Sequence, residues 1–252
     1  MTRRPDLPGV DSLFGSTATP KPAPPVSDSH PAASEPAPQS VAKQPTPAAP
    51  PEPAKVDDAM RDGALKAVCD TSVHVTAAIA AAANVQTAPS DEVGALLRWL
   101  VASMKATHVV EVGSAGGVTG LWSVENQPQV TLTSIEQDEH LHKLAKQVFK
   151  DARVTSQVRA IHADGTTVLP RLADESYDLI VLQAGAGKLA GDLAEAVRIL
   201  KPGGTLLARG VLRGGAHAKA NAAFVSALVE HRFMTVTVLT VDDGVLLATK
   251  TV

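Results

Sequence analysis

The sequence predicts a doubly wound α/β domain whose sheet ends in an antiparallel hairpin. Two observations support this prediction. From Thr107 onwards, short β-rich runs alternate with helical patterns, which is typical of parallel strands joined by right-handed crossovers. Near the end of the sequence the alternation stops, and two β-rich runs flank a tight-turn signal. One terminal strand must therefore enter the otherwise parallel sheet in the reverse sense.

The first part of the sequence has a different composition from the rest. Fourteen of the 18 prolines fall in the first 53 residues, and valine is the only large apolar residue type between Gly15 and the predicted domain. Such a segment cannot bury enough apolar surface to offset the entropy lost on ordering. We expect a disordered tail over residues 1–57 and a folded domain over 58–252, with helices over 58–106 and the sheet over 107–252.

Helices are expected before the sheet. Residues 60–83 are rich in alanine and predict a helix of weak amphipathy. The next helix has a clearer start, because Ser90 is a good N-cap residue and Asp91 and Glu92 suit the first turn. Apolar residues then recur at helical spacing, namely Val93, Leu96, Leu97, Leu100, Val101 and Met104. This apolar stripe is expected to face the core.

The alternating region predicts five parallel strands and the helices between them. The strands are expected at His108–Val112, Val130–Glu136, Val158–Ala163, Tyr177–Leu182 and Thr205–Ala208. The second strand is followed by a helical face of Leu141, Leu144, Ala145, Val148 and Phe149, and the fourth by one of Leu189, Leu193, Ala196, Val197 and Leu200. Lys201–Gly204 predicts a turn that ends the latter helix.

The terminal hairpin completes the predicted sheet. Residues 233–241 form a long β-rich run, Asp242-Asp243-Gly244 is a turn signal, and Val245–Thr249 is a second run. Two strands joined by so short a turn must be antiparallel. A dinucleotide-binding sheet of the dehydrogenase type does not need this hairpin.

Composition and charge exclude several classes of protein. One cysteine, Cys69, rules out an intramolecular disulfide framework and fits a reducing compartment. No stretch approaches the roughly 18 continuous apolar residues of a membrane helix, so no membrane association is expected. The net charge is −3 and aromatic residues make up 3% of the chain, which disfavours nucleic acid as a partner. We expect a cytoplasmic protein.

A glycine-rich segment after the first strand is the strongest candidate for ligand binding. Residues 109–119 predict a strand, a turn containing Gly113, Gly116 and Gly117, and the start of a helix. Glycines there let the backbone approach a ligand closely. The segment is not a dinucleotide fingerprint, because the second glycine of that motif is replaced by Ala115. A turn that needs glycine only for its geometry is the alternative interpretation.

Two acidic residues follow the next strands. Glu136 ends the second strand, 23 residues after Gly113, and a carboxylate at that place can accept both hydroxyl protons of a ribose. Asp164 follows the third strand and can either bind an adenine amino group or cap the short helix after it. These two roles are compatible.

These motifs, in this order, resemble the catechol- and caffeoyl-CoA-type small-molecule O-methyltransferases over residues 89–250. The resemblance implies a Rossmann-like, seven-stranded class I methyltransferase fold that binds S-adenosylmethionine (SAM), and a homodimer formed through the helices before Thr107. It also implies how the cofactor is bound. The residues so implied for the methionine moiety, the ribose and the adenine are Glu111, Gly113, Ser114, Gly117, Glu136, Ala163 and Asp164, and Gln183 is a further candidate at the same rim.

The sequence departs from this family at its metal site. The family places Asp-x-x-Lys after the fourth strand and Asp-Asn after the fifth, and both aspartates and the asparagine bind a divalent cation. Here Gln183 and Ala186 take the first pair of positions, and Arg209 and Gly210 take the second. Magnesium needs hard oxygen ligands, which these residues do not supply. No metal is therefore expected.

Three residues are candidates for catalysis in the absence of a metal. Arg209 either replaces the cation by binding an anionic oxygen of the substrate or is a solvent-facing remnant of a decayed site. Lys188 lies two positions after the family's lysine, and His217 follows the Gly214-Gly215 loop. Either of them can serve as a base, although a surface or capping role is the simpler interpretation.

Two function hypotheses follow. The first is a metal-independent SAM-dependent methyltransferase that acts on an oxygen of a small molecule. The second is a catalytically inactive domain on the same fold that binds SAM as a sensor or interaction module, a role favoured by the replaced catalytic positions and the long tail. A nicotinamide dehydrogenase is disfavoured by Ala115 and by the terminal hairpin.

Overall fold

The computed structural model describes residues 57–68, 72–82, 85, 88–183 and 189–251. The predicted disordered tail lies outside these residues, apart from Asp57. Among the described residues, no helix is long and apolar enough to cross a membrane.

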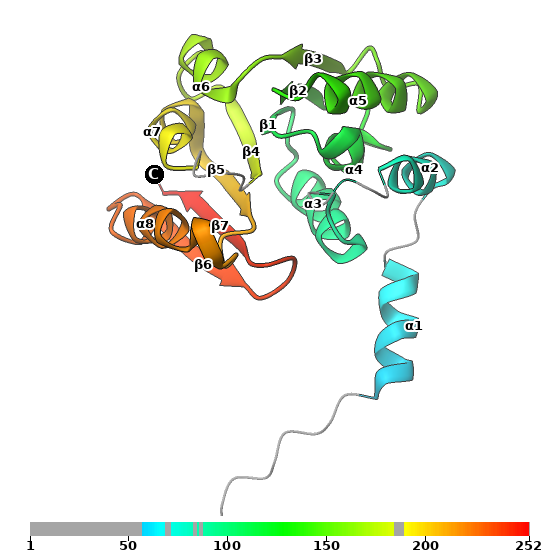
Figure 1. The fold of residues 1–252 in the computed structure, drawn as a ribbon, viewed down its shortest axis with the longest axis horizontal. Helices are drawn as coiled ribbons and strands as arrows, with labels where there is room; N and C mark the ends of the chain where they lie inside the picture. Colours follow the sequence, from blue (N-terminus) through cyan, green and yellow to red (C-terminus); the bar gives the residue numbers. More distant parts are fainter. Residues whose placement is uncertain (1–56, 69–71, 83–84, 86–87, 184–188, 252) are drawn as a thin grey trace, which may run out of the picture. The chain divides into compact units, whose positions relative to one another are not determined.

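A seven-stranded sheet forms the centre of the fold, in the order β3-β2-β1-β4-β5-β7-β6 (Figure 1). Strands β1 to β5 are parallel, whereas β7 runs antiparallel to both β5 and β6. The predicted α/β class and the reversed terminal strand are therefore confirmed. The strands are β1 His108–Val112, β2 Thr131–Glu136, β3 Val158–His162, β4 Tyr177–Gln183, β5 Leu200–Arg209, β6 Met234–Leu239 and β7 Val245–Lys250.

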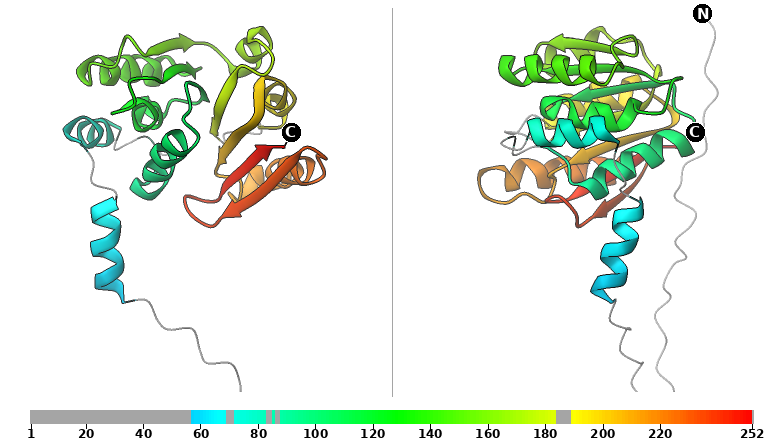
Figure 2. Two further views of the ribbon diagram at one scale, coloured as in Figure 1. Left: turned by 180° about the vertical axis from the view of Figure 1, so that it is seen from behind. Right: turned by 90° about the vertical axis from the view of Figure 1, so that its right-hand side faces the viewer.

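Helices cover both faces of the sheet (Figure 2). The α-helices are α1 Asp58–Val68, α2 Val73–Ala81, α3 Asp91–Ser103, α4 Val118–Val124, α5 Glu139–Asp151, α6 Gly165–Val168, α7 Leu189–Ile199 and α8 Ala218–Val229. Short 3-10 turns are η1 Ala115–Gly117, η2 Leu169–Arg171 and η3 Gly215–His217.

The core is divided in two by the sheet. Successive strand residues point to opposite faces. Val109 therefore belongs to a core cluster with residues of α2, α3, α4 and α5, whereas Val110 belongs to a second cluster with residues of α7 and α8. Trp122 of α4 and Phe224 of α8 are among the largest fully buried side chains, one in each half. Both faces are apolar because every central strand is covered on both sides.

The predicted single helix over residues 60–83 is wrong, since this region contains α1 and α2. Helix α2 begins after Ser72, whose hydroxyl accepts hydrogen bonds from the amides of His74 (3.2 Å) and Val75 (3.3 Å). A serine that satisfies the first free amides of a helix favours a new start over a continuous helix. Alanine content alone did not reveal this boundary.

Strand β5 is longer than predicted. It begins at Leu200 and contains the expected Lys201–Gly204 turn as an irregularity, because Tyr177 pairs with Leu200 whereas Leu179 pairs with Thr205. Five steps along β5 therefore oppose two steps along β4. Gly203 adopts a φ of +78°, which only glycine accepts readily. Pro202, Gly203 and Gly204 therefore form a bulge within β5 and not a turn before it.

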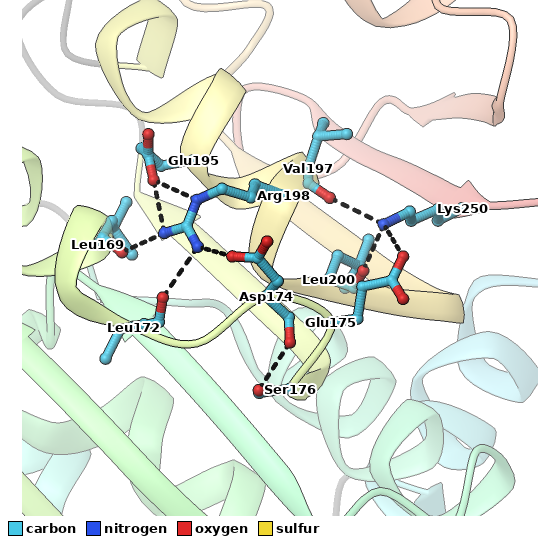
Figure 3. A network of polar contacts seen from close by, with 10 residues as sticks. All are labelled: Leu169, Leu172, Asp174, Glu175, Ser176, Glu195, Val197, Arg198, Leu200 and Lys250. Atoms are coloured by element: carbon cyan, nitrogen blue, oxygen red, sulfur yellow. Dashed lines mark hydrogen bonds and ion pairs between the residues drawn. The ribbon is translucent and has the colours of Figure 1, made fainter.

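A polar network ties α7 to the segment before β4 (Figure 3). Arg198 donates to the backbone carbonyl oxygens of Leu169 and Leu172, at 3.0 Å each, and pairs with Glu195 and Asp174. The guanidinium group has five donors in a planar fork, which allows one side chain to satisfy several acceptors. This network lies away from the carboxyl ends of the strands and fixes α7 against the sheet.

Candidate functional site at the carboxyl edge of the sheet

The predicted site residues gather at one edge of the sheet. Because β1 to β5 are parallel, their carboxyl ends meet there, which is where ligands bind in open α/β sheets. Gln183 and Arg209 are direct register partners at the ends of β4 and β5. The other candidates at this edge are Gly113, Ser114, Glu136, Ala163 and Asp164, which end or follow β1, β2 and β3.

The glycine-rich turn after β1 has positive φ angles at all three of its glycines, and the packing around Gly113 and Gly117 restricts these positions to glycine. Gly113 has a φ of +92°, and a Cβ atom there would lie 2.6 Å from the Cβ of Gln183. Gly117 has a φ of +93°, and its Cβ would lie 3.0 Å from the Cα of Ala145. The turn therefore packs closely against both β4 and α5. This geometry explains the glycines even without a ligand, because the turn itself is closely packed, with Ser114 and Ala115 buried.

Glu136 is oriented by the same turn. One carboxylate oxygen, Oε2, accepts hydrogen bonds from the amide (2.9 Å) and the hydroxyl (3.1 Å) of Ser114, and the other, Oε1, accepts one from the amide of Asp138 (3.0 Å). The residue is only 6% exposed. A carboxylate offers about four acceptor positions, so these three donors leave room on Oε1 for a hydroxyl group.

Glu111 of β1 lies beneath α4. Its Oε1 accepts a hydrogen bond from the hydroxyl of Ser134 (2.6 Å), and its Oε2 has no hydrogen-bond partner among the described residues. Burial raises the pKa of Glu111 to about 8, and the charge of Glu136 adds to this effect, while the Ser134 hydrogen bond opposes it. The carboxyl group is therefore largely protonated at neutral pH.

Asp164 caps the short helix α6. Its Oδ1 accepts hydrogen bonds from the amide (3.1 Å) and the hydroxyl (2.9 Å) of Thr166. The capping interpretation is confirmed, and binding of an adenine amino group stays a prediction. Ala163 continues the β2–β3 ladder by donating its amide to the carbonyl oxygen of Glu136 (3.0 Å), which places it beside the predicted ribose-binding residue.

Arg209 is buried at the end of β5, and the interpretation as a solvent-facing remnant is wrong. The residue is 5% exposed. Its guanidinium donates to Oε1 of Gln183 (3.0 Å), to the carbonyl oxygen of Ala88 (3.2 Å) and to Oδ2 of Asp242 (2.9 Å). Burial lowers the pKa of Arg209 and the charge of Asp242 opposes this, and the group stays charged at physiological pH.

Asp242 is a site residue whose sequence context predicts only a turn. Its Oδ2 accepts hydrogen bonds from the Arg209 guanidinium and from the amide of Ser90 (2.8 Å), the N-cap residue of α3. A buried arginine at a strand end needs an anionic partner, and this requirement is the signal that points to a nearby acid. The sequence does not show which of the neighbouring acids that is.

The metal-site positions of the resembled family do not fit a divalent cation. The only oxygen ligand that Gln183, Arg209 and Gly210 offer through their side chains is the Gln183 amide oxygen, and this oxygen accepts from Arg209. Within the described part of the chain, no group of three or more His, Cys, Asp or Glu side chains is arranged to hold a metal ion. The guanidinium group thus lies where a metal ligand would be needed.

Of the two remaining catalytic candidates, Lys188 and His217, the structure describes only His217. Lys188 and Ala186 lie outside the described residues. His217 ends η3, directly before α8. It is not one of the three hydrogen-bond acceptors given above for Arg209 among the described residues. A role for either Lys188 or His217 as a base stays a prediction.

Comparison with known proteins assigns the chain to a family. The family model described as O-methyltransferase matches residues 64–251. The chain belongs to the O-methyltransferase family. This family membership confirms the resemblance inferred from the glycine-rich turn, the acidic strand ends and the terminal hairpin.

Relatives of this O-methyltransferase family member occur in mycobacteria. A protein of Mycobacterium sp. (strain JLS) that is classed as an O-methyltransferase is 36% identical over 169 residues, covering 63% of this chain and 77% of the relative. A Mycobacteroides abscessus protein of the same class is 40% identical over 125 residues, covering 49% of this chain and 58% of the relative. The match to the second relative thus spans little more than half of its length.

Solved structures of O-methyltransferases share the fold. A Staphylococcus aureus protein classed as a caffeoyl-CoA O-methyltransferase superposes with a TM-score of 0.67 at 19% identity, covering 77% of this chain and all of the other. TomG from Streptomyces achromogenes, an O-methyltransferase of tomaymycin synthesis solved in complex with SAM, gives a TM-score of 0.66 at 21% identity, covering 72% and 91%. At these identities the likeness establishes the fold.

Proposed function

We propose that this O-methyltransferase family member transfers the methyl group of SAM to an oxygen atom of a small molecule without a bound divalent cation. The observation that carries the proposal is the carboxyl edge of the sheet, where a glycine-rich turn and an oriented carboxylate adjoin a buried guanidinium at the metal-site positions. The family membership supports the reaction. The replaced ligands support its independence from metal.

The residues at this edge suit SAM. Glu136 keeps an acceptor position on Oε1 for a ribose hydroxyl, and a second hydroxyl can replace the Ser114 hydroxyl on Oε2. The turn at Gly113 lets the backbone approach the amino-acid part of the cofactor. Glu111 contributes a buried oxygen without a partner among the described residues, which suits a cationic or donor group. We assign the adenine to the segment at Ala163 and Asp164.

Bound SAM supplies a methyl group on a positively charged sulfur. The sulfur is a good leaving group, because it departs as the neutral thioether of SAH. Displacement at that carbon needs the attacking oxygen in line with the leaving sulfur, so the protein contributes mainly by holding the two reactants in position. We assign removal of the hydroxyl proton to Lys188 or His217. A base is needed because a neutral hydroxyl is a weak nucleophile.

Arg209 supplies the fixed positive charge of this edge in our proposal. Three oxygen atoms surround its guanidinium, contributed by β4, by the segment before α3 and by the β6–β7 turn. The guanidinium is thus a fixed positive charge surrounded by oxygen atoms, as a bound metal ion would be. Because these partners are internal, we assign Arg209 to shaping and charging the edge, and not to direct binding of the acceptor.

A radiochemical assay tests the proposal. Purified full-length protein is incubated with methyl-labelled SAM and a panel of phenolic and hydroxylated small molecules, with EDTA or with magnesium. We expect transfer to at least one acceptor at the same rate in both conditions. Stimulation by magnesium that EDTA abolishes would contradict metal independence.

Calorimetry with SAM and its demethylated product, S-adenosylhomocysteine (SAH), accompanies the assay. Binding of both ligands is expected. Failure to bind either ligand would reject the enzyme assignment, whereas binding without transfer to any acceptor would assign the domain to the sensor role.

A further inference from the structure

Glu111 has an environment that the proposed reaction does not itself require. The residue is 1% exposed, its Oε1 has one hydrogen-bond donor at 2.6 Å, and its Oε2 has no partner among the described residues. A buried ionised carboxylate with so few donors is costly. The free protein therefore keeps this group in its neutral form, in line with its raised pKa of about 8.

The position of Glu111 connects it to the candidate cofactor site. Glu111 pairs in register with Ser134, and side chains two residues apart on a strand share a face. Glu111 and Glu136 therefore belong to the same face of the sheet at its carboxyl edge. Glu111 is two residues from the first glycine of the turn and lies close enough to Glu136 for their charges to interact.

Among the residues that the structure describes, none that packs around Glu111 brings a positive charge to it. Helix α4 covers the carboxyl group, since a Cβ atom on Gly120 would lie 2.7 Å from its Oε1, and α4 contains no ionisable residue. Phe149 of α5 packs beside Gly120, and Val181 of β4 is the register partner on the other side. Glu136 of β2 is the titratable neighbour, and it is an acid.

We propose that SAM binding ionises Glu111, so that cofactor binding is coupled to release of a proton to solvent. SAM brings a sulfonium and an ammonium charge against one carboxylate charge, and this net positive charge supplies the potential that Glu111 lacks in the free protein. SAH has lost the sulfonium charge. It therefore stabilises the ionised carboxylate less and releases a smaller fraction of a proton.

This inference rests on the proposed binding of SAM and makes affinity depend on pH in a defined direction. By linkage, a ligand that releases one proton binds up to about tenfold more tightly for each pH unit. The gain occurs between the pKa of Glu111 in the complex and its higher pKa in the free protein, and it ends near pH 8. SAM is thus favoured over SAH as the pH rises towards 8.

Calorimetry in several buffers of different ionisation enthalpy measures the released protons directly. We expect the enthalpy of SAM binding at pH 7 to depend on the buffer with a slope that approaches about one proton per SAM. The slope for SAH should be clearly smaller. The α-amino group of the ligand itself titrates near about 8, and the variant below corrects for it.

Glu111→Gln keeps the size and the acceptor for Ser134 but cannot ionise. We expect this variant to bind SAM with an enthalpy almost independent of buffer and with most of the pH dependence below 8 removed. Glu125→Gln is the matched control, because Glu125 is also a buried glutamate (8% exposed) but lies after the other end of α4. The control should release protons as the wild type does.

Infrared difference spectra of the wild-type protein give a second measurement that needs no variant. Addition of SAM should remove the band of a protonated carboxyl group and add that of a carboxylate. Binding of SAM with no buffer dependence and no carboxyl band change would overturn the inference while leaving the proposed function intact. Absence of SAM binding would reject both.

Discussion

Arg209 shows how far a single residue can depart from its family role without disturbing the fold. The backbone of β5 still delivers position 209 to the carboxyl edge, in register with Gln183. The side chain changes the charge at that edge. Arginine, a long cation with a planar set of donors, stands where the resembled family has aspartate, a short anion. Its three oxygen partners then come from the protein.

A reversal of the metal-site substitutions tests this interpretation at the residue level. We expect the triple variant Gln183→Asp, Arg209→Asp and Gly210→Asn to bind manganese or magnesium, because it restores hard oxygen ligands and removes the fixed cation. Calorimetric titration with the metal alone measures the effect. Equal metal binding by the wild type would contradict our interpretation of the edge.

Gly113→Ala should damage the glycine-rich turn. The new Cβ would lie 2.6 Å from the Cβ of Gln183 at a φ of +92°, so that both packing and backbone are strained. We expect a loss of roughly 1–3 kcal/mol in the free energy of unfolding and much weaker SAM binding, measured by urea denaturation and calorimetry. Gly63→Ala is the control: its Cβ meets nothing within 4 Å, and in α1 it should be neutral or slightly stabilising.

The raised pKa of Glu111 also predicts a pH dependence of stability. Between pH 4.5 and about 8 the folded state holds a proton that the unfolded state has released. The free energy of unfolding should therefore fall as pH rises through this window, by up to ~1.4 kcal/mol per pH unit from this group. Glu111→Gln should lose this slope and gain stability relative to wild type at pH 8, as measured by urea denaturation at pH 5, 6.5 and 8. An unchanged slope would contradict the assignment.

The strands and helices were largely predictable, and their boundaries were less so. Strong periodic signals gave α3 and the central strands correctly, because burial on one or both faces dictates where apolar residues recur. The division between α1 and α2 and the bulge in β5 were missed. Both depend on local hydrogen bonding, at the Ser72 cap and at Tyr177 beside Leu200, which apolar periodicity does not report.

The location of the candidate site was predictable from the sequence, whereas the hydrogen-bond partners within it were not. The parallel topology predicted which residues reach the carboxyl edge, since strand ends meet there whatever their side chains. It did not predict that Asp242 pairs with Arg209 or that Glu136 is held by Ser114. Such partners lie far apart in the sequence, and only the folded chain brings them together.

At the opposite edge of the sheet, Asp178 connects β1, β4 and β5. Its carboxylate accepts the amides of Thr107 and His108, at 2.9 Å each, and a hydrogen bond from the ammonium group of Lys201 at 2.6 Å. Burial alone would raise the pKa of Asp178, but these hydrogen bonds outweigh it and lower the pKa to about 2. The ionised carboxylate is therefore part of the folded structure.

Asp178→Asn should destabilise the sheet and leave the candidate site unchanged. We expect a loss of roughly 1–2 kcal/mol at pH 7, with solvent screening of this partly exposed group included. Because the folded pKa is depressed, the charge-dependent part is present above pH 3.8 and is lost as pH falls through about 2. Denaturation at pH 7 and pH 3 measures the stability. Weakened SAM binding by a folded variant would contradict the separation of the two edges.

At the scale of the whole molecule, the Arg209–Asp242 pair joins distant parts of the chain. It links β5 to the β6–β7 turn, and the same carboxylate oxygen holds the amide of Ser90 at the start of α3. The start of α3, the end of β5 and the β6–β7 turn are thus held together at the rim of the sheet. The ion pair is a structural connection as well as a source of charge.

A double-mutant cycle measures this connection. Arg209→Met and Asp242→Asn should each destabilise the protein, by about 3–5 kcal/mol for a fully buried pair and less for this one, since Asp242 keeps some exposure. The double variant should lose clearly less than the sum, because neither partner is then left uncompensated. Strict additivity in thermal or urea denaturation would show that the two side chains do not interact.

The position of β7 between β5 and β6 has a consequence for biosynthesis. When a ribosome has made the chain as far as Leu239, β5 still lacks its second neighbour, β7, because Arg209 pairs with Val245 and Thr205 with Thr249. Until those residues emerge, β5 exposes one unpaired edge that is prone to misassociation. Closure of this gap waits for residues 245–249, so that a ribosome stalled before residue 245 would present an incomplete rim to chaperones.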